Sequence, residues 1–478
     1  MKKDMTKGNE WRLIIVFALP IIVANLLQQM YNTVDNIIVG NFAEASMPGS
    51  FAAVSTSAPL AFLFLAFSIG LGAGAAVVCA QLFGARRERD LAIAVDTAMI
   101  LMTVVGLGVM VIGLALTPML FRSVLQVHDP EVFRLGVAYM RIYLIGIPFQ
   151  FLYNAIASVL RGVGNSRASL LFLFITSAVN VLLDLWFVIG FGWGVQGAAV
   201  ATVISQVICV VVSYTYLRRK FPFTKSERHF DKGICLSIVR IGLPSAIQMS
   251  IVSFGNVAMM RLVHYFAATN TAGNAIVDAY GAGTRIDFFV HVPVMGLQSA
   301  LAGFTGQNIA ANRIDRVKRG YYMTIGTSLS IAIVLCLLIY FFAAPILSLF
   351  GLADDAIKIG SEMIQFYAKI FWVFAIYNSG SGVLQGSGDT IIQSGATLIA
   401  LAARVTIAYI GVYAFNWFGY EAAWVTLIYG WVIAIVITTT RFYTGGWKKK
   451  VIARRAPESG ELPEAAADAA PSGGTEIE

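Results

Sequence analysis

The sequence has few charged residues for its length. Asp, Glu, Lys and Arg make up 13% of its 478 residues, against about 25% in a typical soluble domain. Apolar residues make up 58%, and the mean hydropathy is +0.75. These values exclude an ordinary soluble protein and indicate a polytopic membrane protein. The net charge of +8 does not indicate a nucleic-acid partner, because the basic residues lie in short loops between apolar runs.

Cysteine and histidine are equally scarce, and neither shows the spacing of a ligand set. No two of the four cysteines form a C-x-x-C pair, so we expect buried apolar side chains rather than disulfides or metal ligands at Cys79, Cys209, Cys235 and Cys336. The phosphate-binding pattern GxxxxGK[ST] is absent, as is any cluster of histidines with acids. We therefore expect no enzyme activity, no direct ATP coupling and no cofactor.

Long apolar runs, in contrast, are abundant, and a membrane span needs about 20 such residues. The first run resembles a signal peptide but is too long for one, so we expect it to be retained as a helix. The predicted fold class is an all-α membrane protein with twelve transmembrane helices, near residues 11–39, 51–80, 91–117, 132–160, 168–190, 195–217, 236–264, 276–308, 320–343, 357–384, 390–415 and 420–441.

Basic residues occur in alternate loops and so predict an orientation. They crowd the N-terminus and residues 85–89, 218–232, 312–319 and 447–455, all on one side of a twelve-span chain. Because Lys and Arg favour the cytoplasmic side, we expect both termini in the cytoplasm and the protein in the plasma (inner) membrane. The C-terminal residues 442–478 are predicted to form a basic stretch followed by a disordered acidic tail.

The chain contains an internal repeat. "YNAIASVLRGVGNSR" at 153–167 resembles "YNSGSGVLQGSGDTI" at 377–391, and the same offset of 224 pairs Pro20 with Pro244. Gln81 pairs with Gln307 at an offset of 226. Six spans per half give parallel repeats that can rock about a shared interface. We predict an N-terminal lobe at 1–217, a cytoplasmic linker at 218–235 and a C-terminal lobe at 236–441.

Two acids lie inside predicted spans of the first half. Asp35 follows a polar stripe that includes Gln28 and Asn32, and Asn180 and Asp184 lie four residues apart on one helix face. Burying an acid in a bilayer costs roughly 2.5–3.5 kcal/mol on insertion scales, so such residues are functional candidates. Carboxylate and amide oxygens suit a proton or a hard cation. The alternative is that these acids pair with amides only to hold helices together.

The repeat offers an internal control for this choice. An offset of 224 maps Asp35 to Met259, Asn180 to Arg404 and Asp184 to Ala408. If the acids only held a bundle together, the second half should need them as well. Their absence there favours an ion site that belongs to the first lobe.

Two motifs within this organisation resemble a known family. "LPIIVANLLQQMYNTVDNIIVG" in the first span and "VLRGVGNSR" after the fourth are similar to the multidrug and toxic compound extrusion (MATE) transporters, over about residues 11–441. The resemblance implies a V-shaped pair of lobes and cation-coupled export of organic, often cationic, compounds.

The resemblance also implies a site. The closest branch is the DNA-damage-inducible-F-like and archaeal one, which has an aspartate in helix one, Asn and Asp in helix five and a threonine in helix six. These match Asp35, Asn180, Asp184 and Thr202, which are the predicted H+ or Na+ coupling site, with Tyr139 a further candidate. Acids that another branch carries in helices seven and ten have no counterpart here.

The substrate is expected between the lobes, among helices one, two, seven and eight. The predicted substrate contacts are Gln28, Tyr31, Asn154 and Met259. Further charges lie on helix eight, where we expect Asp278 with Arg285 and Asp287 with His291 to form neutralising pairs that face the interior; the alternative is a second proton or substrate site.

The predicted function is therefore a secondary antiporter that exports amphiphilic, cationic compounds in exchange for H+ or Na+. The expected partners are a small-molecule substrate and membrane lipid, and we expect a monomer. The alternative is a lipid-linked oligosaccharide flippase of the same superfamily, which should have a more cationic cavity.

Overall fold

The computed structural model describes residues 4–43, 47–125, 127, 129–220 and 229–451, and the elements within these ranges are all helical. The middle of the predicted linker and the predicted acidic tail lie outside the described residues. The first half consists of α1 (Glu10–Ile38), the π-helical turn η1 (Val39–Ala43), α3 (Ser50–Gly84), α4 (Glu88–Met119), the π-helical turn η2 (Leu120–Val124), α5 (Pro130–Gly162), α6 (Ser166–Asp184), the π-helical turn η3 (Leu185–Gly190) and α7 (Gly194–Lys220).

The second half has the same six long helices, but short α-helices rather than π-helical turns lie between some of them. It consists of α8 (Lys232–Thr269), α9 (Asn274–Ala310), α10 (Ile314–Phe341), the short α11 (Ala343–Ser348), α12 (Asp354–Ser387), α13 (Thr390–Tyr413), the short α14 (Ala422–Val425), α15 (Leu427–Thr444) and the 3-10 turn η5 (Gly446–Lys449). Twelve helical segments are long and apolar enough to cross a membrane, as predicted. Several exceed 30 residues and so extend beyond the roughly 20 that a bilayer requires.

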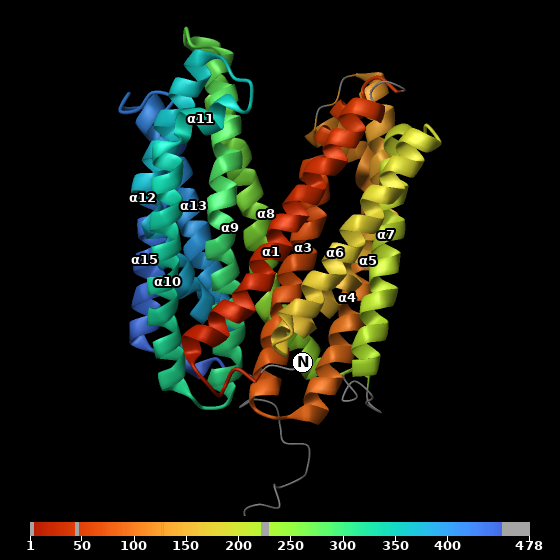
Figure 1. The fold of residues 1–478 in the computed structure, drawn as a ribbon, viewed down its shortest axis with the longest axis vertical. Coiled ribbons are helices and arrows are strands. Elements are labelled where there is room, and N and C mark those ends of the chain that lie inside the picture. Colours follow the sequence, from red (N-terminus) through yellow and green to blue (C-terminus); the bar gives the residue numbers. More distant parts are fainter. Residues whose placement is uncertain (1–3, 44–46, 126, 128, 221–228, 452–478) are drawn as a thin grey trace, which may run out of the picture.

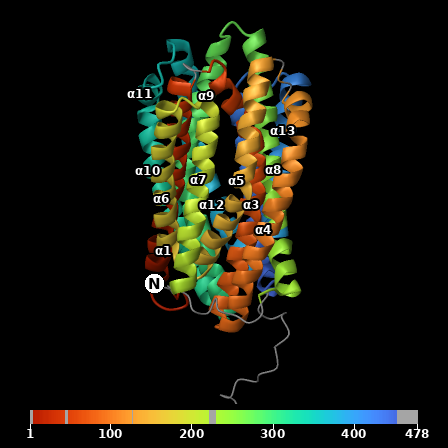
Figure 2. The same ribbon diagram turned by 90° about the vertical axis from the view of Figure 1, so that its right-hand side faces the viewer.

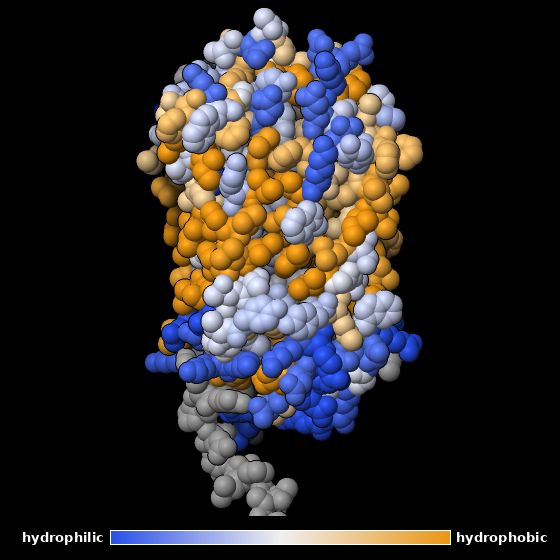
Figure 3. All heavy atoms as spheres, turned by 90° about the vertical axis from the view of Figure 1, so that its left-hand side faces the viewer, coloured by the Kyte–Doolittle hydropathy of each residue, from blue (hydrophilic) through white to orange (hydrophobic). Residues whose placement is uncertain are grey.

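The helices form two bundles arranged as a V (Figure 1). We call α1 to α7 the N lobe and α8 to α15 the C lobe; Figure 2 views the molecule from the N-lobe side. The bundles converge at the end that carries the N-terminus, where α3 packs against α8 and α9, and they diverge at the other end. We call these the closed end and the open end. A broad apolar band lies between two more polar ends, as expected for a membrane-spanning surface (Figure 3).

Helix α1 crosses from one bundle to the other (Figure 1). Its first half buries Ile14 and Phe17 against Leu301 and Phe304 of α9, inside the C-lobe core. Its last residue, Ile38, belongs instead to an N-lobe core cluster. The end of α1 that carries Asp35 is thereby fixed to the N lobe, beside α6 and α7.

Candidate functional site

The predicted coupling residues lie on α1, α6 and α7 of the N lobe, and two of these helices, α1 and α6, change to a π-helical turn beside them. Asp184 is the last residue of α6 and directly precedes the π-helical turn η3. Asp35 lies in the last turn of α1, just before the π-helical turn η1. Such turns are rare and frequently accompany functional sites, because they shift side chains around the helix axis.

The carboxyl groups of Asp35 and Asp184 lie within hydrogen-bonding reach of each other. Asp184 is fully buried, and Asp35 is half-buried. The amide of Asn180 joins Asp184 to α7: it donates to Asp184 Oδ2 at 2.8 Å and accepts from the Thr202 backbone N–H at 3.2 Å. One oxygen of each carboxyl group, Oδ1, is buried and has no hydrogen-bond partner among the side chains that the structure describes. The structure therefore brings Asp35, Asn180, Asp184 and Thr202 together in one cluster.

Tyrosines enclose this cluster. The Tyr31 hydroxyl reaches Thr202, and its ring lies close enough to Asp35 and Asp184 to interact with their charge. Tyr139 lies near the same two acids and stacks on Tyr143, with ring centroids 6.3 Å apart. The predicted additional residue, Tyr139, thus lies in the cluster as well.

This arrangement suits the reversible binding of a small cation. Two buried carboxylates at close range repel each other, and a shared proton or a bound hard cation removes that repulsion. The unpartnered Oδ1 atoms of Asp35 and Asp184 are the ligands that such an ion would satisfy. The residues present therefore fit either H+ or Na+.

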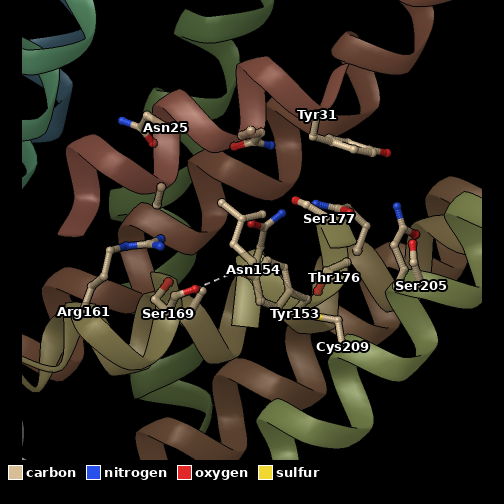
Figure 4. A pocket seen from close by; sticks show the side chains of 16 residues that line it. Asn25, Tyr31, Tyr153, Asn154, Arg161, Ser169, Thr176, Ser177, Ser205 and Cys209 are labelled. Atoms are coloured by element: carbon tan, nitrogen blue, oxygen red, sulfur yellow. Dashed lines mark hydrogen bonds between the residues drawn. The ribbon is translucent and has the colours of Figure 1, made fainter. Parts of the chain in front are cut away.

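A cavity of about 120 Å³ lies next to the cluster, inside the N lobe. Its lining comes from α1, α5, α6 and α7: Ala24, Asn25, Gln28, Tyr31, Gln150, Tyr153, Asn154, Ala157, Arg161, Ser169, Leu173, Thr176, Ser177, Ser205, Gln206 and Cys209. Figure 4 shows Asn25 and Tyr31 of α1 on one side of the cavity and Tyr153 and Asn154 of α5 on the other. Asp35, Asn180 and Thr202 each lie about one helical turn from a lining residue, so the cavity and the cluster of coupling residues share α1, α6 and α7.

Three of the four predicted substrate contacts, Gln28, Tyr31 and Asn154, line this cavity. The fourth, Met259, is fully buried in the C-lobe core and does not reach it. The cavity also lies within one lobe, whereas the predicted substrate site lay between the lobes.

Several lining residues were not predicted from the sequence. Gln150 and Gln206 lie on largely apolar helices and were not singled out, although Gln150 precedes the predicted Asn154 by four residues. Arg161 lies in a segment that we used only as evidence of the repeat. A usable signal was present on α6, where Ser169, Thr176 and Ser177 continue the polar face of Asn180 towards the helix start.

The C lobe has no equivalent of the carboxyl pair. Met259 and Ala408, which correspond to Asp35 and Asp184, are buried in an apolar cluster. Arg404, which corresponds to Asn180, donates to the Ala423 backbone carbonyl at 3.1 Å. The two lobes therefore differ at these positions both in sequence and in how the side chains are packed.

The charges on α9 differ from the prediction in part. His291 Nδ1 lies 3.2 Å from Asp287 Oδ1, so this pair is present. Asp278 and Arg285 are both exposed and form no ion pair with each other, so the prediction of an interior pair is wrong there. Their spacing of seven residues places them on one helix face, and that face is exposed rather than packed inside a bundle.

Comparison with known proteins agrees with this architecture. The chain is 30% identical over 473 residues to the probable multidrug resistance protein YoeA of Bacillus subtilis, covering 94% of this chain and 96% of the relative. It is 26% identical over 388 residues to the probable multidrug resistance protein YpnP of the same organism, covering 80% of this chain and 84% of the relative. A crystal structure of MATE in complex with MaD3S superposes with a TM-score of 0.82 at 25% identity, covering 93% and 98% of the two chains.

The family model MatE matches two segments of the chain, residues 20–186 and 244–410. They begin 224 residues apart, which is the offset of the paired motifs in the sequence. Together they cover more than half of the chain. The chain therefore belongs to the MatE family of multi-pass membrane transporters.

Proposed function

We propose that the protein is a secondary antiporter that exports amphiphilic organic compounds in exchange for H+ or Na+. The observation that carries this proposal is the pair Asp35 and Asp184, in which each acid has a buried oxygen without a partner among the described side chains. Asp35 lies about one helical turn from the cavity, and Asp184 about two. A membrane potential supplies about 2.3 kcal/mol per charge per 100 mV. That amount supports a concentration ratio of about fifty per transported charge.

Tyr31 is the proposed link between the ion and the substrate. Its side chain lines the cavity, and its hydroxyl reaches Thr202 of the carboxyl cluster. A substrate in the cavity and an ion on the carboxyl pair would therefore each favour a different position of the Tyr31 side chain. Such competition would give exchange, because the two ligands favour different arrangements of α1.

The proposed orientation places the closed end in the cytoplasm, with the lobe boundaries predicted from the sequence. Arg86 and Arg316 both lie at this end, where residues Asp4 and Glu10 pair with them. Positively charged loops favour the cytoplasmic side. We propose that the protein acts as a monomer in the plasma membrane and that its open end faces outwards in this orientation. Membership of the DNA-damage-inducible-F-like and archaeal branch is proposed on the match of Asp35, Asn180, Asp184 and Thr202.

The charge of the cavity lining limits where a cationic substrate could carry its positive charge. Arg161 is the one charged side chain among the lining residues that the structure describes, and its guanidinium donates to Ser158 Oγ at 2.8 Å. Amides and hydroxyls dominate the remaining polar lining. We therefore propose amphiphiles with several hydrogen-bonding groups, in which any positive charge lies away from Arg161. Met259 is left out of the proposed contacts because the C-lobe core encloses it.

Efflux from liposomes tests the proposal. Purified protein is reconstituted, the vesicles are loaded with ethidium, and a pH gradient or a sodium gradient is imposed separately. We expect efflux under one of the two gradients, and collapse of that gradient by an ionophore should stop it. Efflux that requires neither gradient, or no efflux under either, would contradict ion-coupled antiport.

A further inference from the structure

The paired motifs of the repeat meet at the closed end. Helix α5 ends at Gly162 within "LRGVGN", and α12 ends one residue after Gly386 within "LQGSGD". Gly164 and Gly388 follow with φ values of 81° and 86°, a left-handed conformation that glycine adopts without strain. The backbone N–H of Asn165 bonds to the Leu160 carbonyl, and that of Asp389 bonds to the Leu384 carbonyl. Both helices therefore end in the same Schellman-type cap.

These caps leave the carbonyl groups of Gly162 and Gly386 without helical partners, as is usual in a last turn. Each accepts a hydrogen bond from a glutamine of the opposite lobe. Gln307 Nε2 of α9 donates to the Gly162 carbonyl of α5 at 3.0 Å. Gln81 Nε2 of α3 donates to the Gly386 carbonyl of α12 at 3.2 Å.

The two bonds are equivalent under the internal repeat. Gln81 and Gln307 both lie in the last turn of their helices, and both side chains are fully buried. Each is followed five residues later by a non-glycine residue with positive φ, Arg86 at 58° and Asn312 at 56°. Each lobe therefore donates one glutamine hydrogen bond to the other lobe and accepts one from it.

We propose that Gln81 and Gln307 form a reciprocal latch that holds the lobes together at the closed end and must break whenever the protein changes its access from one side to the other. Each bond connects the two lobes, so rotation of one lobe against the other at this end breaks both. A buried amide is stable only while it is paired or hydrated. The latch consequently favours two states over intermediate ones. In one state the lobes are in contact at this end and both amides are paired, and in the other the lobes are apart and both amides are hydrated.

Close backbone packing surrounds the latch. A side chain at Gly84 would collide with the backbone of Gln307, and one at Gly306 would collide with Ala80. Glycine at these positions lets α3 and α9 approach closely enough for each glutamine to reach across. The latch therefore depends on direct contact between the lobes at this end.

The N-terminal segment adds a third partner that breaks the symmetry. The backbone N–H of Met5 donates to Gln307 Oε1 at 2.9 Å, and Asn308 Nδ2 donates to the Met5 carbonyl at 3.1 Å. Arg86 of the N lobe lies 3.9 Å from Asp4. Burial would raise the pKa of the Asp4 carboxyl, but hydrogen bonds from Thr6 and the charge of Arg86 outweigh it and lower this pKa. Asp4 thus stays ionised near neutral pH.

The latch is tested by measuring the distance across the open end. Spin labels are placed at Arg134→Cys of α5 and Leu349→Cys after α11, both well-exposed positions on opposite lobes, after replacement of the four native cysteines. Closure of the open end should appear as a shorter distance. Because one buried hydrogen bond contributes about tenfold to such an equilibrium, we expect Gln81→Leu and Gln307→Leu each to raise the ratio of short to long distances about tenfold. The double variant should raise it by about a hundredfold.

Gln298→Leu is the matched control. Gln298 lies on the same helix as Gln307, but its amide donates to Ser381 Oγ of its own lobe at 3.1 Å. We expect this variant to leave the distances unchanged. If a leucine variant does not yield monodisperse protein, Gln81→Asn and Gln307→Asn keep the amide but shorten its reach, and should give the same shift. An unchanged distance distribution in the folded double variant, or an equal shift in Gln298→Leu, would overturn the latch.

Discussion

Asp35 and Asp184 lie on helices far apart in the chain, yet their carboxyl groups meet and each leaves one buried oxygen unpartnered. The sequence could predict that Asn180 and Asp184 share a helix face, because that follows from a spacing of four. It could not predict that Asp35 faces them, because this depends on how α1 packs on α6. Gln206 was missed for the same reason, since tertiary packing decides whether an amide on a largely apolar helix lines a cavity.

The carboxyl pair predicts a non-additive response to mutation. Asp184→Asn should reduce gradient-driven efflux to near background, and the Asp35→Asn and Asp184→Asn double variant should be little worse than the single variant. Two acids that bind one ion lose that ion when either is neutralised, so the second loss adds little. Initial efflux rates in liposomes measure this. Two partial defects that multiply in the double variant would indicate two independent acids.

Arg161 predicts an effect on substrate charge. Arg161→Gln removes the one charge of the cavity lining, and we expect efflux of a cationic substrate to improve several-fold relative to a neutral one, because a like-charge repulsion is lost. Arg167→Gln is the control, since it removes an exposed charge outside the cavity lining. An equal change for cationic and neutral substrates would show that Arg161 does not act through charge.

At the scale of helices, hydropathy predicted the spans but not their ends or interruptions. All twelve predicted helices are present. The π-helical turns after Asp35 and Asp184 were not predicted, because an extra residue in one turn leaves the apolar pattern unchanged. The paired G-x-G sequences were recognised as a repeat, but their role as caps depends on backbone angles that appear only in the structure.

The caps predict a stability difference between two glycines of the same region. Gly388→Ala places a side chain at a φ of 86° and should destabilise the fold by about 1–2 kcal/mol. Gly395→Ala lies within α13, where an added methyl group meets nothing within 4 Å, and should be neutral or slightly stabilising. Thermal unfolding of the detergent-solubilised variants measures both. Equal unfolding midpoints would argue against the cap.

At the scale of the molecule, α1 connects the two lobes. Its first half packs in the C-lobe core, while its last turn carries Asp35 into the N lobe. Rotation of the lobes must therefore bend or shift α1, and this would move Asp35 and Tyr31 relative to Asp184 and Thr202. The sequence indicated two equivalent six-helix lobes, but it could not show that α1 is shared between them, because its apolar pattern is the same along its whole length.

The central claim is that an ion on the Asp35 and Asp184 pair drives substrate against its gradient. The most direct test measures two properties of the Asp35→Asn protein in liposomes. The first is ethidium efflux under an imposed H+ or Na+ gradient, and the second is ethidium binding without any gradient. We predict that gradient-driven efflux falls to background, while ethidium still binds with an affinity close to that of the wild type. Gradient-driven efflux near the wild-type rate would contradict the account, because the buried acid would then serve only to hold the helices together.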